Sequence, residues 1–180
     1  MSNTLSQLTP FPNKKIFGFE NASLIKNDSL SHATNEVLIV SNKKIKFVGP
    51  RSEVPPQWRD CFWIDANGWL ITPGFINSHT HVAMSFFRGL LHAQDNMLEK
   101  FIFPAEKSLD AELVEALSYS SILAGLKSGT TTFNDHYFFS DAVGRACQQF
   151  GVRAFIGETL QDLGGPFPKM VSVDQVEDRI

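Results

Sequence analysis

Short apolar runs separated by polar turns fill the N-terminal part of the chain. Residues 15–25 predict one or two strands, and two apolar runs within residues 37–48 flank a polar loop, which is typical of a β-hairpin. Residues 61–65 form another apolar run, and Asn67-Gly68 after it is a strong turn signal. We therefore predict a series of short antiparallel strands over residues 1–72, arranged as a sheet or as part of a β-sandwich.

The pattern changes after His81, where strand-like runs begin to alternate with segments of helical periodicity. The elements expected in order are a strand ending at His81, a helix over residues 110–128, a strand over 130–134, a helix over 140–150 and a strand over 153–157. Asp110 and Ser140 suit the N-cap positions of the two helices. Between these elements, residues 97–103 predict a helical turn or two that Pro104 ends. This order of elements predicts parallel βα units.

Composition narrows the class of protein without identifying it. The 180 residues are 43% hydrophobic and carry a formal charge of -3, which is typical of a globular domain with a buried core. Because no basic block stands out, we expect no nucleic-acid partner. No stretch approaches the roughly 20 apolar residues of a membrane span, and the first ten residues lack an apolar signal core. Two cysteines are too few for a disulfide framework, so we predict a cytoplasmic protein with no membrane contact.

Two histidines one residue apart are the first candidates for chemistry. His79 and His81 follow a Pro-Gly turn and a short apolar run. In an extended segment, side chains at i and i+2 point to the same face, so both imidazoles can reach one metal ion. Histidine is a common metal ligand, although two histidines also fall this close by chance.

Ionisable residues also end the next two predicted strands. Asp135 and His136 end the second strand, and Glu158 ends the third. In parallel α/β architectures the loops after the strands form a shared cleft, so these side chains are candidates for contact with substrate or metal. Each residue also has a structural alternative. Asp135 caps the following loop in that case, His136 packs beneath the neighbouring tyrosine, and Glu158 is a solvated carboxylate.

Four motifs together resemble the amidohydrolase superfamily. They are Pro73-Gly74-Phe75-Ile76-Asn77-Ser78-His79-Thr80-His81, Met84-Ser85-Phe86-Phe87-Arg88-Gly89, Phe103-Pro104-Ala105-Glu106 and Gly129-Thr130-Thr131-Thr132-Phe133-Asn134-Asp135. Within the superfamily they are similar to the branch that contains the methylthioadenosine/S-adenosylhomocysteine deaminases and the triazine chlorohydrolases. The resemblance covers nearly the whole chain in order.

The resemblance implies a (β/α)₈ TIM-type barrel with a small β-sandwich built from both ends of the chain. It implies one divalent metal ion, zinc or alternatively iron, which His79 and His81 bind together with ligands from later strands. The implied reaction is hydrolytic deamination or dechlorination of an N-heterocyclic substrate by metal-activated water. In the family, a carboxylate located beyond the third strand is the proton shuttle of this reaction.

The length of the chain departs from this pattern. A barrel of this type needs about 250 residues, so we expect an incomplete barrel of about three βα units in residues 73–180, preceded by part of the sandwich in residues 1–72. The sequence thus predicts the N-terminal part of a longer enzyme, inactive alone, and with no catalytic residue of its own. Its expected partners are a complementary C-terminal chain or further copies in a homo-oligomer. The alternative is a non-catalytic remnant that acts only as a folding or interaction module.

The expected substrate is a small N-heterocycle or a nucleoside-like molecule. We predict Asn96, His136 and Glu158 as substrate-binding residues. In the related deaminases an acidic residue that holds ribose hydroxyls occupies the position of Asn96, and an amide lacks the charge that pairs strongly with hydroxyls. Asp95 takes this role instead if the loop is shifted by one residue.

Overall fold

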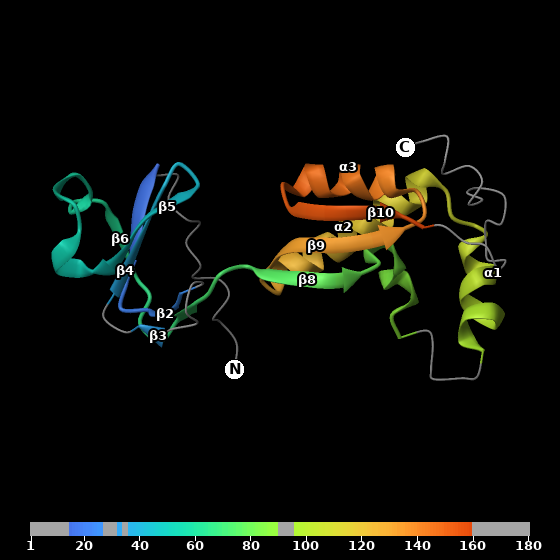
Figure 1. Ribbon diagram of the computed structural model, residues 1–180, viewed down its shortest axis with the longest axis horizontal. Coiled ribbons are helices and arrows are strands. Elements are labelled where there is room, and N and C mark those ends of the chain that lie inside the picture. The colour runs from blue at the N-terminus through green and yellow to red at the C-terminus, as the bar shows by residue number, and fades with distance from the viewer. Residues whose placement is uncertain (1–14, 27–31, 34–35, 90–95, 160–180) are drawn as a thin grey trace, which may run out of the picture. The chain divides into compact units, whose positions relative to one another are not determined.

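The computed structural model describes residues 15–26, 32–33, 36–89 and 96–159 (Figure 1). The chain divides into two compact units, Met1–Pro73 and Gly74–Ile180. No helix among the described residues is long and apolar enough to cross a membrane.

In the first unit, the described residues form short strands in two sheets. The strands are β1 (Ile16–Glu20), β2 (Ser23–Ile25), β3 (His32–Ala33), β4 (Glu36–Ser41), β5 (Lys44–Pro50), β6 (Phe62–Asp65) and β7 (Leu70–Ile71), with 3₁₀ turns at Arg51–Glu53 and Pro56–Trp58. The sheets have the orders β5-β4-β1-β6 and β3-β2-β7. The predicted hairpin is confirmed as β4 and β5, which pair antiparallel through a turn in which Asn42 and Lys43 both have positive φ.

The prediction that these strands are all antiparallel was wrong for two pairs. β6 runs parallel to β1, and β7 runs parallel to β2. A two-residue turn forces antiparallel pairing, whereas a long connection allows either direction. The hydrophobic pattern alone does not distinguish the two.

The described part of the second unit holds three parallel strands and two main helices. Its elements are β8 (Phe75–Thr80), a 3₁₀ segment (Val82–Phe87), a π-helical segment (Leu98–Ile102), α1 (Phe103–Glu106), α2 (Ala111–Lys127), β9 (Thr130–Tyr137), α3 (Ser140–Phe150) and β10 (Arg153–Glu158). The sheet order is β10-β9-β8, all parallel, and the three arrows point the same way in Figure 1. The predicted series of parallel βα units is confirmed. Among the described residues this sheet has three strands and does not close into a barrel.

Two predicted local details were wrong for identifiable reasons. Pro104 does not end the helical turn but lies in the first turn of α1, where its missing N–H is not needed. Ser140 is the first residue of α3 rather than its N-cap, which is Phe139 at φ 57°. The predicted cap Asp110 is confirmed, because its Oδ1 accepts a hydrogen bond of 2.8 Å from the Leu113 N–H.

Alternation along β9 separates a packed face from an open one. Phe133, Asp135 and Tyr137 are buried, whereas Asn134 and His136 are exposed. The buried face joins a core that also includes buried residues of α2 and α3, such as Val114, Ile122, Val143 and Ala146. The open face therefore presents His136 at the carboxyl end of the strand.

Candidate metal centre

The hydrogen-bond ladder between β8 and β9 is irregular where the histidines begin. Asn77 pairs with Phe133, and the next paired residues are Thr80 and Asp135. Three steps along β8 thus correspond to two steps along β9, which is a β-bulge. A bulge bends its strand and redirects the side chains that follow. His79 lies within this irregular stretch, and His81 follows it directly.

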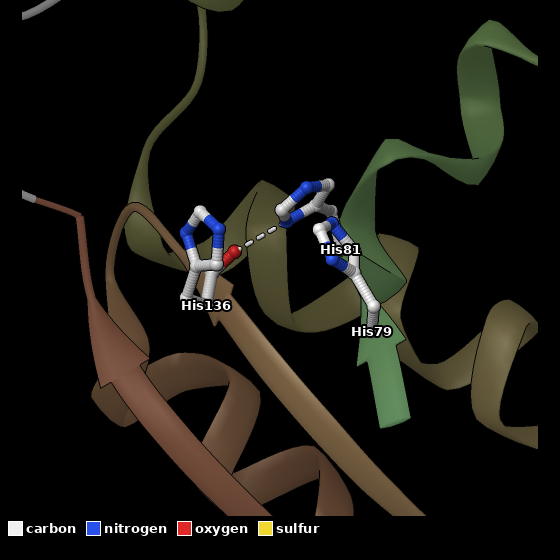
Figure 2. Close-up of side chains that lie close together, drawn as sticks. All are labelled: His79, His81 and His136. Atoms are coloured by element: carbon white, nitrogen blue, oxygen red, sulfur yellow. Dashed lines mark hydrogen bonds between the residues drawn. The ribbon is translucent and has the colours of Figure 1, made fainter. Parts of the chain in front are cut away.

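Three imidazoles gather at these strand ends, as Figure 2 shows. One ring nitrogen from each of His79, His81 and His136 lies within 4.8 Å of the others. The ring centroids of His81 and His136 are 4.4 Å apart, and those of His79 and His81 are 5.2 Å apart. The structure therefore brings His79 and His81 together, as their spacing predicts, and adds His136 to the same group.

One hydrogen bond determines which nitrogen of His81 carries a proton. His81 Nδ1 lies 2.6 Å from the main-chain oxygen of His136 (Figure 2). Since a carbonyl oxygen only accepts, Nδ1 must donate, and in the neutral imidazole Nε2 then keeps its lone pair. Metal-binding histidines commonly use their second nitrogen in this way, which orients the ring.

Electrostatics favour the neutral imidazole at His136. Burial, with smaller contributions from His81 and His79, lowers the pKa of this side chain from its ordinary value. The neutral form is the one that binds metal. Three neutral imidazoles are also a donor set of catalytic zinc sites, in which a fourth position stays open for water or substrate. The residues present thus fit a divalent ion such as zinc.

A buried carboxylate lies directly beneath this group. Asp135 is 2% exposed, and its Oδ1 accepts a 2.6 Å hydrogen bond from the Val82 main-chain N–H. Its Oδ2 is buried and has no hydrogen-bond partner among the residues that the structure describes. Burial raises the pKa of this carboxyl, with the Val82 hydrogen bond and His81 opposing the shift.

A pocket of about 330 Å³ adjoins the histidines. Its wall includes His81, His136, Glu106 and Tyr137 beside apolar side chains. The Tyr137 hydroxyl donates a 2.5 Å hydrogen bond to Glu106 Oε1, and both residues are 3% exposed. Burial raises the pKa of Glu106 and also that of Tyr137. Sequence reasoning assigned no role to either residue, although the alternation of β9 would have placed Tyr137 on its buried face.

The other predicted site residues lie outside the histidine group. Glu158 Oε2 accepts hydrogen bonds from the Ser140 main-chain N–H, at 3.1 Å, and from its hydroxyl, so it caps the N-terminus of α3. Asn96 is exposed at φ 58°, and its carbonyl oxygen accepts a bond from the Lys100 N–H. Asp95 lies outside the described residues. The substrate-binding roles of Asn96, His136 and Glu158 stay predictions.

A parallel α/β unit with ionisable side chains at its strand ends is the architecture on which many hydrolases are built. The model of the Amidohydrolase family matches residues 70–178, which is more than half of the chain. The chain belongs to the amidohydrolase family.

Curated relatives and solved structures agree with this assignment. The chain is 38% identical over 129 residues to the 5-methylthioadenosine/S-adenosylhomocysteine deaminase of Syntrophobacter fumaroxidans, covering 71% of this chain and 30% of the relative. The deaminase of Thermodesulfovibrio yellowstonii is 39% identical over 135 residues, with the same two coverages. The chain thus spans about 30% of the length of these relatives.

Two solved structures share the fold. A triazine hydrolase from Arthobacter aurescens has a TM-score of 0.74 at 18% identity, covering 92% of this chain and 41% of that one. An adenosine deaminase from Xanthomonas campestris with bound zinc has a TM-score of 0.69 at 25% identity, covering 91% and 37%.

Proposed function

We propose that this chain carries part of the metal centre of an amidohydrolase that deaminates, or alternatively dechlorinates, an N-heterocyclic or nucleoside-like substrate. The observation that carries the proposal is the group of three imidazoles at the carboxyl ends of β8 and β9. The names of the relatives support the substrate class, since two are deaminases of 5-methylthioadenosine and S-adenosylhomocysteine and one structural neighbour is a triazine hydrolase.

His79 and His81 would hold the ion, with His136 as the third imidazole within reach. Zinc is the expected metal and iron the alternative. When bound, such an ion acts as a Lewis acid and lowers the pKa of a coordinated water. In this chain His81 offers Nε2 because Nδ1 donates to the main chain, and partial desolvation lowers the pKa of His136, which favours its neutral form. The apolar side chains of the adjoining pocket offer a surface against which an N-heterocycle would pack.

Zinc binding by the 180-residue chain tests the ligand assignment. We expect the chain to bind zinc in competition with a chelator, and His79→Ala and His81→Ala each to abolish that binding. Gln148→Ala is the control, because Gln148 is exposed on α3 outside the histidine group, and the zinc affinity of this variant should equal that of the parent. Unchanged zinc affinity in either of the first two variants would overturn the assignment.

The reaction itself needs a separate test, because the chain spans about 30% of its relatives. We expect no ammonia release from 5-methylthioadenosine by the zinc-loaded chain alone. We expect release when it is mixed with the Thermodesulfovibrio yellowstonii deaminase truncated to the part that this chain does not match. Turnover by the chain alone would exclude the need for a complementary chain. Absence of turnover in the mixture, and of chloride release from a chlorotriazine, would support the non-catalytic alternative.

A further inference from the structure

Hydrogen bonds that involve side chains connect β8 and β9 around the register shift between Asn77 and Thr80. Three hydrogen bonds cross between the strand ends in this stretch, and we name them the strand-end bonds. They run from Asn134 Nδ2 to Ser78 O at 2.9 Å, from Val82 N to Asp135 Oδ1 at 2.6 Å, and from His81 Nδ1 to His136 O at 2.6 Å.

The second of these bonds joins the two histidine-bearing main chains. Val82 directly follows His81, and Asp135 directly precedes His136. Holding the Val82 N–H fixes the peptide plane between residues 81 and 82, which limits the directions open to the His81 ring. The carboxylate is 2% exposed, so little water competes for this bond, and its loss would leave the buried N–H unpaired.

Asp135 acts from the opposite side of the strand to the metal-binding group. Along β9, residue 135 faces the packed core and residue 136 faces the open side. The Asp135 carboxylate therefore influences the imidazoles through the main chain.

We propose that Asp135 is a positioning residue: its bond to Val82 holds His81 in the orientation from which Nδ1 donates to the His136 carbonyl and Nε2 points at the ion. The part of this inference that concerns the ion rests on the proposed function. The part that concerns the His81 ring is independent of it.

Two readouts on Asp135→Ala test the proposal. In the metal-free chain, nitrogen NMR of the imidazole rings should show His81 in the Nδ1–H form in the parent and a mixture of both forms in the variant. Zinc affinity should fall by about tenfold or more, the range seen when residues that orient metal ligands are removed. Ser118→Ala is the matched control. It deletes another buried hydrogen bond, from Ser118 Oγ to the Val114 carbonyl within α2, and should change neither readout.

Asp135→Asn decides the question even if the alanine variant does not fold. Its amide oxygen still accepts from Val82, so the Nδ1–H form should persist and zinc affinity should stay within about threefold of the parent. A loss above about tenfold with unchanged His81 protonation would show that Asp135 acts by charge, which overturns the proposal.

The two hypotheses fail in different ways. A parent chain that binds no zinc contradicts the proposed function, while the ring NMR still decides the role of Asp135. A parent chain that binds zinc, together with an Asp135→Ala variant that binds it equally well and keeps the Nδ1–H form, overturns this inference alone.

Discussion

The two ends of the β8–β9–β10 sheet are built on different principles. At the amino end, main chains approach closely: the Phe75 N–H donates to the Gly129 carbonyl at 2.8 Å, and a Cβ on Gly74 would lie 2.2 Å from Thr131 Oγ1. At the carboxyl end, side chains bridge an irregular register through the strand-end bonds. The amino end is thus joined by main-chain hydrogen bonding and close packing, and the carboxyl end by hydrogen bonds that involve side chains.

This difference separates what stabilises the fold from what orients its reactive groups. Close packing does not tolerate added volume, and it does not orient reactive groups. Buried polar contacts such as Asp135–Val82 cost desolvation, yet they fix directions that packing leaves free. In parallel βα architectures reactive groups lie at the carboxyl end. Substitutions at the two ends should therefore separate into stability effects and metal-affinity effects.

Among the substitutions that compare the two ends of the sheet, the largest expected effect is at the carboxyl end, on removal of the third imidazole. His136→Ala should weaken zinc binding by about a hundredfold, or about 2.7 kcal/mol, because two imidazoles leave the ion too open. The free energy of unfolding of the metal-free chain should change little, since the His136 side chain is exposed. Calorimetric zinc titration and urea unfolding measure the two quantities. Unchanged zinc affinity would show that His136 is not a metal ligand and would favour the substrate-binding role that we predict for it from the sequence.

At the amino end, added volume should produce the reverse pattern. Gly74→Ala puts a Cβ into the Thr131 side chain and should lower the free energy of unfolding by about 1–3 kcal/mol, with zinc affinity of the folded chain unchanged. Gly144→Ala is the matched control. Gly144 lies within α3, and its new Cβ would be 3.7 Å from the Ile156 side chain, an ordinary van der Waals distance. Gly144→Ala should raise the free energy of unfolding by about 0.5–1 kcal/mol. If the Gly74→Ala variant is as stable as the parent, close packing at the amino end does not contribute to stability as we propose.

The elements that local pattern determines were predictable, and so was the proximity of two of the three imidazoles of the candidate site. The β4–β5 hairpin, the α2 boundaries and the parallel β8–β9–β10 series follow from alternation, capping and the order of elements. The proximity of His79 and His81 follows from a two-residue period. The parallel pairing of β1 with β6 did not follow, because a long connection leaves strand direction open.

The rest of the site depends on contacts between distant positions. His136 joins His79 and His81 only because β9 lies beside β8 with a bulge between them. Tyr137 and Glu106 are separated by 31 residues, and no local signal pairs them. Sequence reasoning placed ionisable residues at the correct strand ends, but the partner of each depends on register.

The smallest expected effect concerns the buried carboxyl of Glu106 beside the carboxyl end. Burial raises its folded-state pKa above the unfolded value. The stability that Glu106 contributes is therefore fully present below the unfolded pKa, about 4.3, and is lost as pH rises through the folded value. Glu106→Gln keeps an oxygen that accepts from Tyr137 but never ionises, so the variant should gain stability relative to the parent as pH rises from about 4 to 8.

Glu115→Gln supplies a control of opposite sign for this measurement. The hydrogen bonds that Glu115 accepts from Tyr119 and Arg145 lower its pKa, so its contribution is present above the unfolded pKa and is lost as pH falls. This variant should lose stability relative to the parent over the same rise in pH. Urea unfolding at each pH gives both differences. Parallel trends in the two variants would contradict a Glu106 pKa that burial raises above its unfolded value.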